Sequence, residues 1–151
     1  MSNIKDVDEI KDLIQVLKSG SEFYRDAKDE VKDSSLITTF ENVATDHDEC
    51  ITRLQPFVVA QEGSPEDGSS WAVKAREAYT EVKAALTSNS DLTYVSQLEE
   101  VEDKLLEACD EALEAEQPLS RKTALAEVRS RLQKTHDRIR AIQHRKERAA
   151  S

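Results

Sequence analysis

Glycine and proline are scarce in this chain, with 3 of each among 151 residues. Structures rich in β-turns need both residue types, so their scarcity favours long helices with few interruptions. The 2 cysteines are too few for a disulfide framework, and they suit a reducing compartment. A chain of this length can bury a substantial core, and we expect a single domain over residues 1–151.

Long apolar runs are also absent. No run approaches the ~20 residues that a membrane span requires, and residues 1–20 lack the apolar segment of a signal peptide. We therefore expect a soluble, cytoplasmic protein that has no membrane partner. The formal net charge of −10 also disfavours nucleic acid as a partner. Residues 138–148 are basic against this trend, and the dipole of a helix that ends there accounts for them.

Apolar residues recur at steps of three and four along most of the chain. The clearest stripe consists of Leu36, Phe40, Val43, His47, Cys50, Leu54 and Phe57. These steps place all seven residues on one face of a helix, at the spacing of a helical bundle. Similar stripes, bounded by Gly, Pro, Ser and Asp residues, predict helices over residues 3–32, 35–61, 71–87, 91–116 and 120–147.

The lengths of these segments predict an all-α four-helix bundle. The connection between the first two helices is short, so they should form an antiparallel hairpin. The shorter 71–87 helix could carry the chain back along the outside of the bundle, which would make the second and third long helices parallel. We predict this ferritin-like arrangement with one crossover, and a simple up-down-up-down bundle is the alternative.

Several short segments indicate a protein family through their order and spacing, although no single segment is diagnostic. These segments are residues 17–24, 27–33 and 63–66, Trp71, residues 82–87, Glu99, Glu102-Asp103 and residues 136–140. Together they resemble a bacterial family of ferritin-like four-helix-bundle proteins labelled domain of unknown function 2383. The resemblance covers nearly the whole chain and implies the ferritin-like bundle, but no activity. The chain departs from the family at Ser19, His47 and Cys50, so His47 and Cys50 inherit no family role.

A di-iron site in a ferritin-like bundle uses one Glu from each of two helices and a Glu-x-x-His motif from each of the other two. These motifs are eroded here, because the second helix offers His47-x-x-Cys50 and the last offers Gln133-x-x-His136. Glu102 lies in the seam of the third long helix, and Glu22 lies one position off the seam of the first. The candidate metal ligands are Glu22, His47, Cys50, Glu102 and His136, and the metal would be iron or zinc.

Each candidate also has a structural interpretation. His47 and Glu102 can satisfy one another as a buried polar pair. Cys50 and Cys109 can pack as small hydrophobic side chains. His136 can lie at the edge of its helix face and cap or pair there.

The chain has no phosphate-binding loop, nucleophile elbow or Cys-x-x-Cys motif, so we predict no catalytic residue and no required cofactor. The leading hypothesis is a non-enzymatic, stress-associated bundle that acts through an unknown protein partner or as a homodimer, with Trp71 at a partly exposed contact. The alternative is a metal-binding or redox protein that uses the eroded site. A third hypothesis is an interaction module whose acidic face meets a basic partner.

Overall fold

The computed structural model of the chain describes residues 7–29, 31–66, 91–115 and 118–150. These residues form four α-helices, which are α1 (Asp8–Ala27), α2 (Ser34–Glu62), α4 (Asp91–Glu114) and α5 (Leu119–Ala150). No strand occurs in the described part of the chain, which confirms the all-α class. The predicted 71–87 helix and Trp71 lie outside the described residues.

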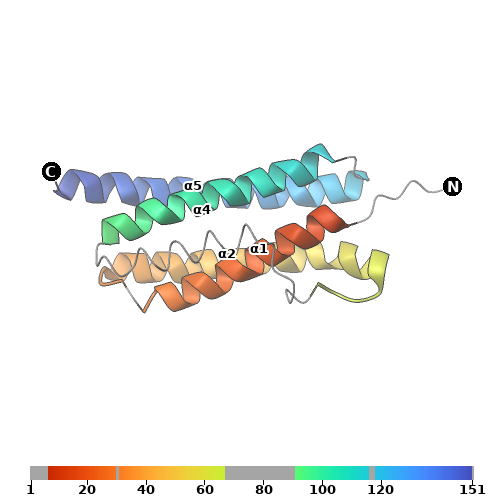
Figure 1. Cartoon of the computed structure of the whole chain (residues 1–151), viewed down its shortest axis with the longest axis horizontal. Coiled ribbons are helices and arrows are strands. Elements are labelled where there is room, and N and C mark those ends of the chain that lie inside the picture. The colour runs from red at the N-terminus through yellow and green to blue at the C-terminus, as the bar shows by residue number, and fades with distance from the viewer. Residues whose placement is uncertain (1–6, 30, 67–90, 116–117, 151) are drawn as a thin grey trace.

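The four helices pack as two hairpins. α1 lies against α2 and α4 lies against α5, while α1 also contacts α4 and α2 also contacts α5. Each helix runs antiparallel to both of its neighbours, so the diagonal pair α2 and α4 runs in the same direction (Figure 1). α2 ends at one end of the bundle and α4 begins at the opposite end (Figure 1).

The first helix is shorter than the sequence pattern predicted. The prediction of a helix over residues 3–32 is wrong at its C-terminal end, because α1 ends at Ala27 and residues 28–29 form a turn. Asp33 is extended, with φ −74° and ψ 118°, and its carboxylate accepts a hydrogen bond of 2.8 Å from the Ser35 N–H. This N-cap starts α2, so the chain must leave the helical conformation before it. Val31 is buried in this connection, which is why it continues the apolar stripe.

The ends of α2, α4 and α5 lie within a few residues of the predictions, whereas the predicted start of the first helix at residue 3 lies outside the described residues. α2 stops at Gly63, whose φ of 83° is left-handed and whose N–H donates to the Val59 carbonyl at 2.8 Å. Glycine adopts this conformation without the steric cost that a side chain would bring. The Pro118 carbonyl accepts the Arg121 and Lys122 N–H groups, which starts α5 one residue before the predicted 120.

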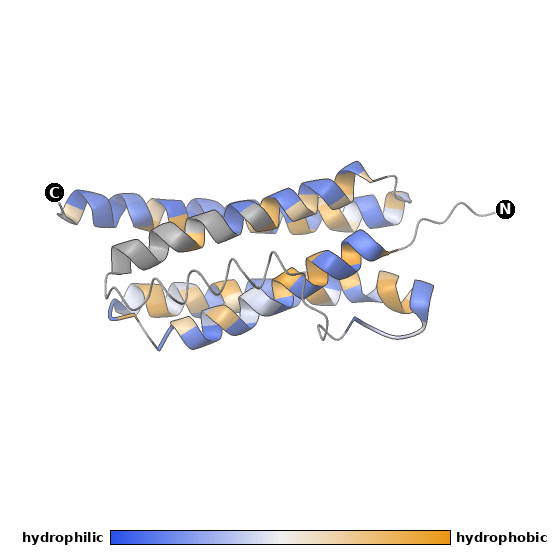
Figure 2. Ribbon diagram, in the orientation of Figure 1, coloured by the Kyte–Doolittle hydropathy of each residue, from blue (hydrophilic) through white to orange (hydrophobic). Residues whose placement is uncertain are grey.

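In the coloured parts of the four helices, apolar residues lie mainly on the sides that face the interior and polar residues on the sides that face outwards (Figure 2). Among the described residues, the buried apolar side chains form two separate clusters. One cluster holds Leu17 on α1, Cys50 on α2, Leu105 on α4 and Leu132 on α5. The other, towards the opposite end, holds Phe40, Leu98 and Ile139, among others. None of the helices in the described residues has a stretch that is long and apolar enough to cross a membrane.

Candidate functional site

A layer of polar side chains separates the two apolar clusters. It lies between Leu17 and Ala27 on α1, Ala44 and Cys50 on α2, Leu98 and Leu105 on α4, and Leu132 and Ile139 on α5. We call it the polar layer, and it comprises Ser21, Tyr24, His47, Glu102, Thr135 and His136, all of them buried. All four helices therefore contribute polar groups to one level of the core.

Tyr24 and Glu102 are joined across the centre of this layer. The Tyr24 hydroxyl donates a hydrogen bond of 2.5 Å to Glu102 Oε1, which links α1 to α4. The Tyr24 ring also makes edge-on contacts with the rings of Phe40 at 5.3 Å and His47 at 5.6 Å between centroids. A buried tyrosine hydroxyl generally finds a partner, and here the partner is the only acid in the seam of α4 among its described side chains.

Burial also moves the ionisation of Glu102 towards neutral pH. Removal from water raises the pKa of its carboxyl to about 7; the Tyr24 hydrogen bond opposes the rise, and the neighbouring Asp103 charge adds to it. The second oxygen of Glu102, Oε2, is buried without a hydrogen-bond partner among the described residues.

His47 approaches the same carboxyl from α2. Its Nε2 lies 3.9 Å from Glu102 Oε1, which is too long for a hydrogen bond. Burial lowers the pKa of His47 to about 4, against the opposing influence of the Asp48 carboxylate and the nearby Leu17 carbonyl. Within the described part of the chain, neither His47 nitrogen has a hydrogen-bond partner of good geometry. The expected His47–Glu102 pair is therefore brought together, but the imidazole and carboxyl do not satisfy one another by a hydrogen bond.

His136 extends the layer to α5. It is buried rather than placed at the edge of its helix face, so that part of the prediction is wrong. The expected pairing is confirmed by distance, because His136 Nε2 lies 2.6 Å from Oδ1 of the exposed Asp103 on α4, but neither His136 nitrogen has a hydrogen-bond partner of good geometry among the described residues. Thr135, the other α5 residue of the layer, is also buried.

A hydrogen-bonded group closes the layer on the outer side of α1 and α2. Ser21 Oγ donates to Asp48 Oδ1 at 2.7 Å, and Arg25 reaches Asp48 Oδ2 at 2.5 Å and also bonds Ser21. Partial burial would raise the pKa of Asp48, but the hydrogen bonds from Arg25 and Ser21 outweigh it and lower that pKa. Asp48 is therefore ionised beside the neutral His47.

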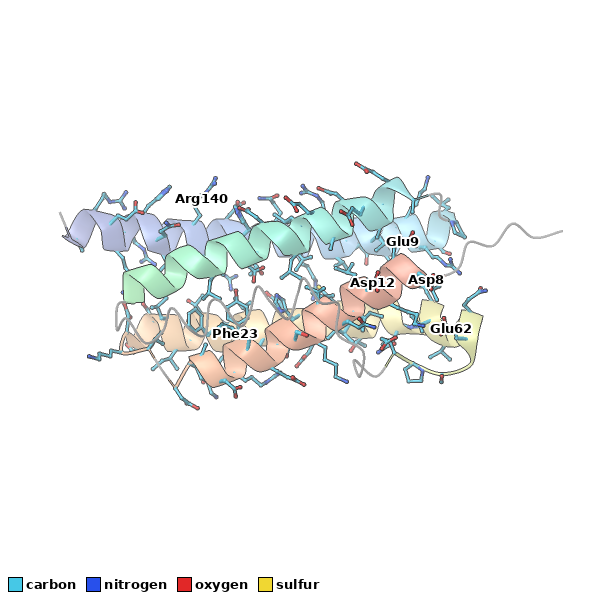
Figure 3. All side chains as sticks on the ribbon, viewed as in Figure 1. Asp8, Glu9, Asp12, Phe23, Glu62 and Arg140 are labelled. Carbon is cyan, nitrogen blue, oxygen red and sulfur yellow. The ribbon has the colours of Figure 1, made fainter. Side chains whose placement is uncertain are left out.

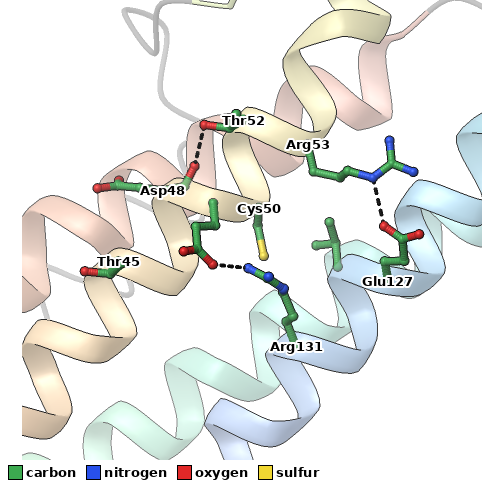
Figure 4. Close-up of a pocket in the computed structure, with 9 residues that line it drawn as sticks. Thr45, Asp48, Cys50, Thr52, Arg53, Glu127 and Arg131 are labelled. Carbon is green, nitrogen blue, oxygen red and sulfur yellow. Dashed lines mark hydrogen bonds and ion pairs between the residues drawn. The ribbon is translucent and has the colours of Figure 1, made fainter.

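Cys50 belongs to a different part of the molecule. It lies in the first apolar cluster and lines an open groove of about 520 Å³ between α2 and α5. The ion pairs Arg131–Glu49 and Arg53–Glu127 cross this groove on either side of the thiol (Figure 4). Burial raises the pKa of Cys50 to about 11, so its thiol is protonated at neutral pH. Cys109 is also a free, buried thiol, and burial raises its pKa to about 12.

The five predicted metal ligands are therefore only partly brought together. His47 and Glu102 meet in the polar layer, His136 is paired with Asp103, and Cys50 faces the groove. Glu22 is exposed on α1. The described residues contain no group of three or more His, Cys, Asp or Glu side chains placed to hold a metal ion.

Four residues of the site were not predicted from the sequence, namely Ser21, Tyr24 and Thr135 of the polar layer and the adjoining Asp103. Tyr24 packs in the second apolar cluster, and its hydroxyl is also the hydrogen-bond donor to Glu102. The sequence signal for this role is a tyrosine at an interior position of a helix, because a buried tyrosine hydroxyl needs a hydrogen-bond partner. Asp103 follows Glu102 directly in the chain, and only the alignment of α4 with α5 shows that it meets His136.

The fold and the site define an all-helical four-helix bundle with a polar layer across its core. The chain belongs to the family described as Domain of unknown function (DUF2383), whose model matches residues 5–115. This confirms the family resemblance inferred from the sequence. The match includes α1, α2 and α4 and ends before α5. No curated protein and no solved structure matches the chain.

Proposed function

We propose that this chain is a non-enzymatic bundle of ferritin-like topology that acts through its surface, by association with a partner or a second copy. The topology is supported by the parallel course of α2 and α4, whose connected ends lie at opposite ends of the bundle (Figure 1). A connection along the bundle then replaces the short turn of an up-down-up-down arrangement.

The polar layer has a structural role in this proposal. The observation that carries it is the hydrogen bond from Tyr24 to Glu102, made within the protein between two fully buried side chains. A protonated carboxyl and a neutral imidazole need no counter-ion in the core. Because a buried polar pair is satisfied in only one alignment of its helices, the layer would select the relative shift of α1, α2 and α4.

Metal content and stability together test this role. Glu102→Gln keeps the size of the side chain and an oxygen that can accept from Tyr24. It should change the free energy of unfolding and leave metal content unchanged after incubation with Fe²⁺ or Zn²⁺, desalting and elemental analysis. Asp26→Asn makes the same carboxylate-to-amide change on the exposed face of α1 and serves as the control. Near-stoichiometric metal in the wild type that is lost only in Glu102→Gln would contradict the proposal.

The second candidate function is metal binding in the polar layer. It is favoured by five buried atoms of the layer that have no hydrogen-bond partner in the described residues, namely both nitrogens of His47, both nitrogens of His136 and Oε2 of Glu102. Imidazole nitrogen and carboxylate oxygen are ligands for zinc and iron, and the Tyr24 oxygen would be a further ligand. The same elemental analysis decides between the candidates, with His47→Gln as an additional variant that should also lose the metal.

A further inference from the structure

Charge is distributed very unevenly between α5 and the rest of the chain. α5 contains ten Lys and Arg residues against three Asp and Glu, a formal charge of +7. Because the whole chain carries −10, the remaining residues carry −17. Figure 3 shows Asp8, Glu9, Asp12 and Glu62 towards one end of the bundle and Arg140 on α5 towards the other.

Several cations of α5 are engaged within the protein. Arg129 pairs with Asp110, Arg131 with Glu49, and Lys146 with Asp33. Three others, Lys134, Arg138 and Arg145, are exposed and make no hydrogen bond or ion pair to any described residue. Their steps of four and seven place them on one flank of α5, over ~16 Å of helix. We call these three residues the basic stripe.

α4 carries a complementary set of acids. Glu107, Glu111 and Glu114 are exposed, follow one another at steps of four and three, and have no partner among the described residues. We call them the acidic stripe. Like charges four residues apart, such as Glu107 and Glu111 or Lys134 and Arg138, repel one another along a helix. Each stripe therefore carries an internal repulsion that no ion pair in the described part of the chain offsets.

The two stripes of one molecule are offset along the bundle, so that only their nearest ends, Glu107 and Lys134, come to almost the same level. The pairs Asp103–His136 and Asp110–Arg129 fix the alignment of α4 with α5. In this alignment the acidic stripe lies beside the first part of α5, and the basic stripe begins beyond it. The centres of the stripes are displaced along the bundle by ~16 Å, about two Debye lengths at physiological salt.

We propose that a second copy of this chain docks on the basic stripe through its acidic stripe. This inference rests on the proposed association function and names its partner. A short run of acids matches a basic stripe of limited length, whereas a long polyanion would continue onto the acidic remainder of the molecule. The contact is heterologous, since the two surfaces differ, so it closes into a ring or continues as an open assembly.

Charge reversal tests the proposal in the full-length protein. One variant is Lys134→Glu with Arg138→Glu and Arg145→Glu, and the other is Glu107→Lys with Glu111→Lys and Glu114→Lys. Sedimentation velocity at low salt, over a range of concentrations, should show association of the wild type that high salt weakens. Each variant alone should lose at least about tenfold in association constant. An equimolar mixture of the two variants should associate again, because the reversed stripes are complementary.

Controls separate this outcome from loss of structure and from general effects of charge. Circular dichroism should show unchanged helix content in both variants. Lys32→Glu with Lys122→Glu reverses exposed cations outside the stripes and should leave association unchanged. A wild type that stays monomeric at low salt, or a mixture that fails to associate, would overturn the proposal. So would a monomer whose basic stripe binds a duplex DNA probe. These outcomes are independent of metal content, so failure here is distinguishable from failure of the structural role of the polar layer.

Discussion

His47 and Glu102 face one another across the core with 3.9 Å between Nε2 and Oε1, and both side chains are fully buried. Burial moves their pKa values in opposite directions, that of Glu102 up to about 7 and that of His47 down to about 4. Over most of the range between these values the pair is uncharged, and its two members respond to pH with opposite effects on stability.

The first prediction concerns these opposite effects. Above its ordinary pKa of 4.5, Glu102 ionises in the unfolded chain but stays protonated in the fold, so its contribution to stability falls as pH rises to about 7. His47 binds a proton in the unfolded chain below 6.5 but not in the fold until about pH 4, so its contribution rises with pH over that window. In the wild type the decrease in stability with pH that comes from Glu102 and the increase that comes from His47 largely cancel.

Removing either ionisable group should therefore reveal the pH dependence of the unfolding free energy that the other group causes. Relative to the wild type, Glu102→Gln should gain stability with rising pH between about 4.5 and 6.5, and His47→Gln should lose it, each by at most ~1.4 kcal/mol per pH unit. Urea unfolding at several pH values in this window measures both. Variant curves that run parallel to the wild-type curve would show that the two groups are not buried in this way.

The second prediction concerns the hydrogen bond that Tyr24 donates to Glu102. Tyr24→Phe keeps the ring contacts with Phe40 and His47 but leaves Glu102 without its donor. We expect a loss of ~1–3 kcal/mol in unfolding free energy, and a larger loss above pH 7 than below it, because the ionised carboxylate needs the donor more. Chemical denaturation at both pH values checks this. An equal loss at the two would mean that the hydroxyl contributes only packing.

The third prediction concerns the end of α2. Gly63 has a φ of 83°, and no atom lies within 4 Å of the position that a Cβ would occupy. Any cost of a side chain there comes from the backbone conformation alone. Gly63→Ala should reduce the unfolding free energy by ~1 kcal/mol, and Gly63→Asn by less, because asparagine tolerates the left-handed region. Thermal unfolding of the two variants side by side tests the order.

The fourth prediction concerns the two thiols. Burial raises the pKa values of both Cys50 and Cys109, so neither should react quickly with a thiol reagent in the folded protein. Cys50 lines the groove between α2 and α5, whereas Cys109 is enclosed, so Cys50 should react first. Labelling of Cys50→Ala and Cys109→Ala, with denatured protein as the fully reactive control, assigns the two rates. Faster labelling of Cys109 would mean that it is reached by a path other than the groove.

Helices and their buried faces could be predicted well because the spacing of apolar residues is a local property. Leu36, Phe40 and Leu54 are all fully buried, as their steps of three and four implied. Phe57 is the exception in that stripe, since it is half-buried and Val58 is buried beside it. The stripe is two residues wide there, and only packing against neighbouring helices decides which residue turns inward.

The polar layer could not be predicted as a layer. His47 and Glu102 were recognised as unusual interior residues, but their level relative to Tyr24 and His136 depends on how far each helix is shifted along its neighbours. That shift follows from contacts between helices, such as His136 with Asp103, and not from the spacing within any one of them. The same lack of alignment explains why five candidate metal ligands were grouped although Cys50 and Glu22 lie elsewhere.

The division of the core by the polar layer has a consequence for how the bundle opens. The apolar side chains form two separate clusters among the described residues, and the side chains that connect them are those of the polar layer, where Tyr24 contacts both Phe40 and His47. The Tyr24–Glu102 hydrogen bond lies within this layer and joins α1 to α4 there. The bundle is thus built as two cooperative units in series. Its amide protons should exchange with solvent in two groups, with the turn between α1 and α2 fraying together with the end that it closes.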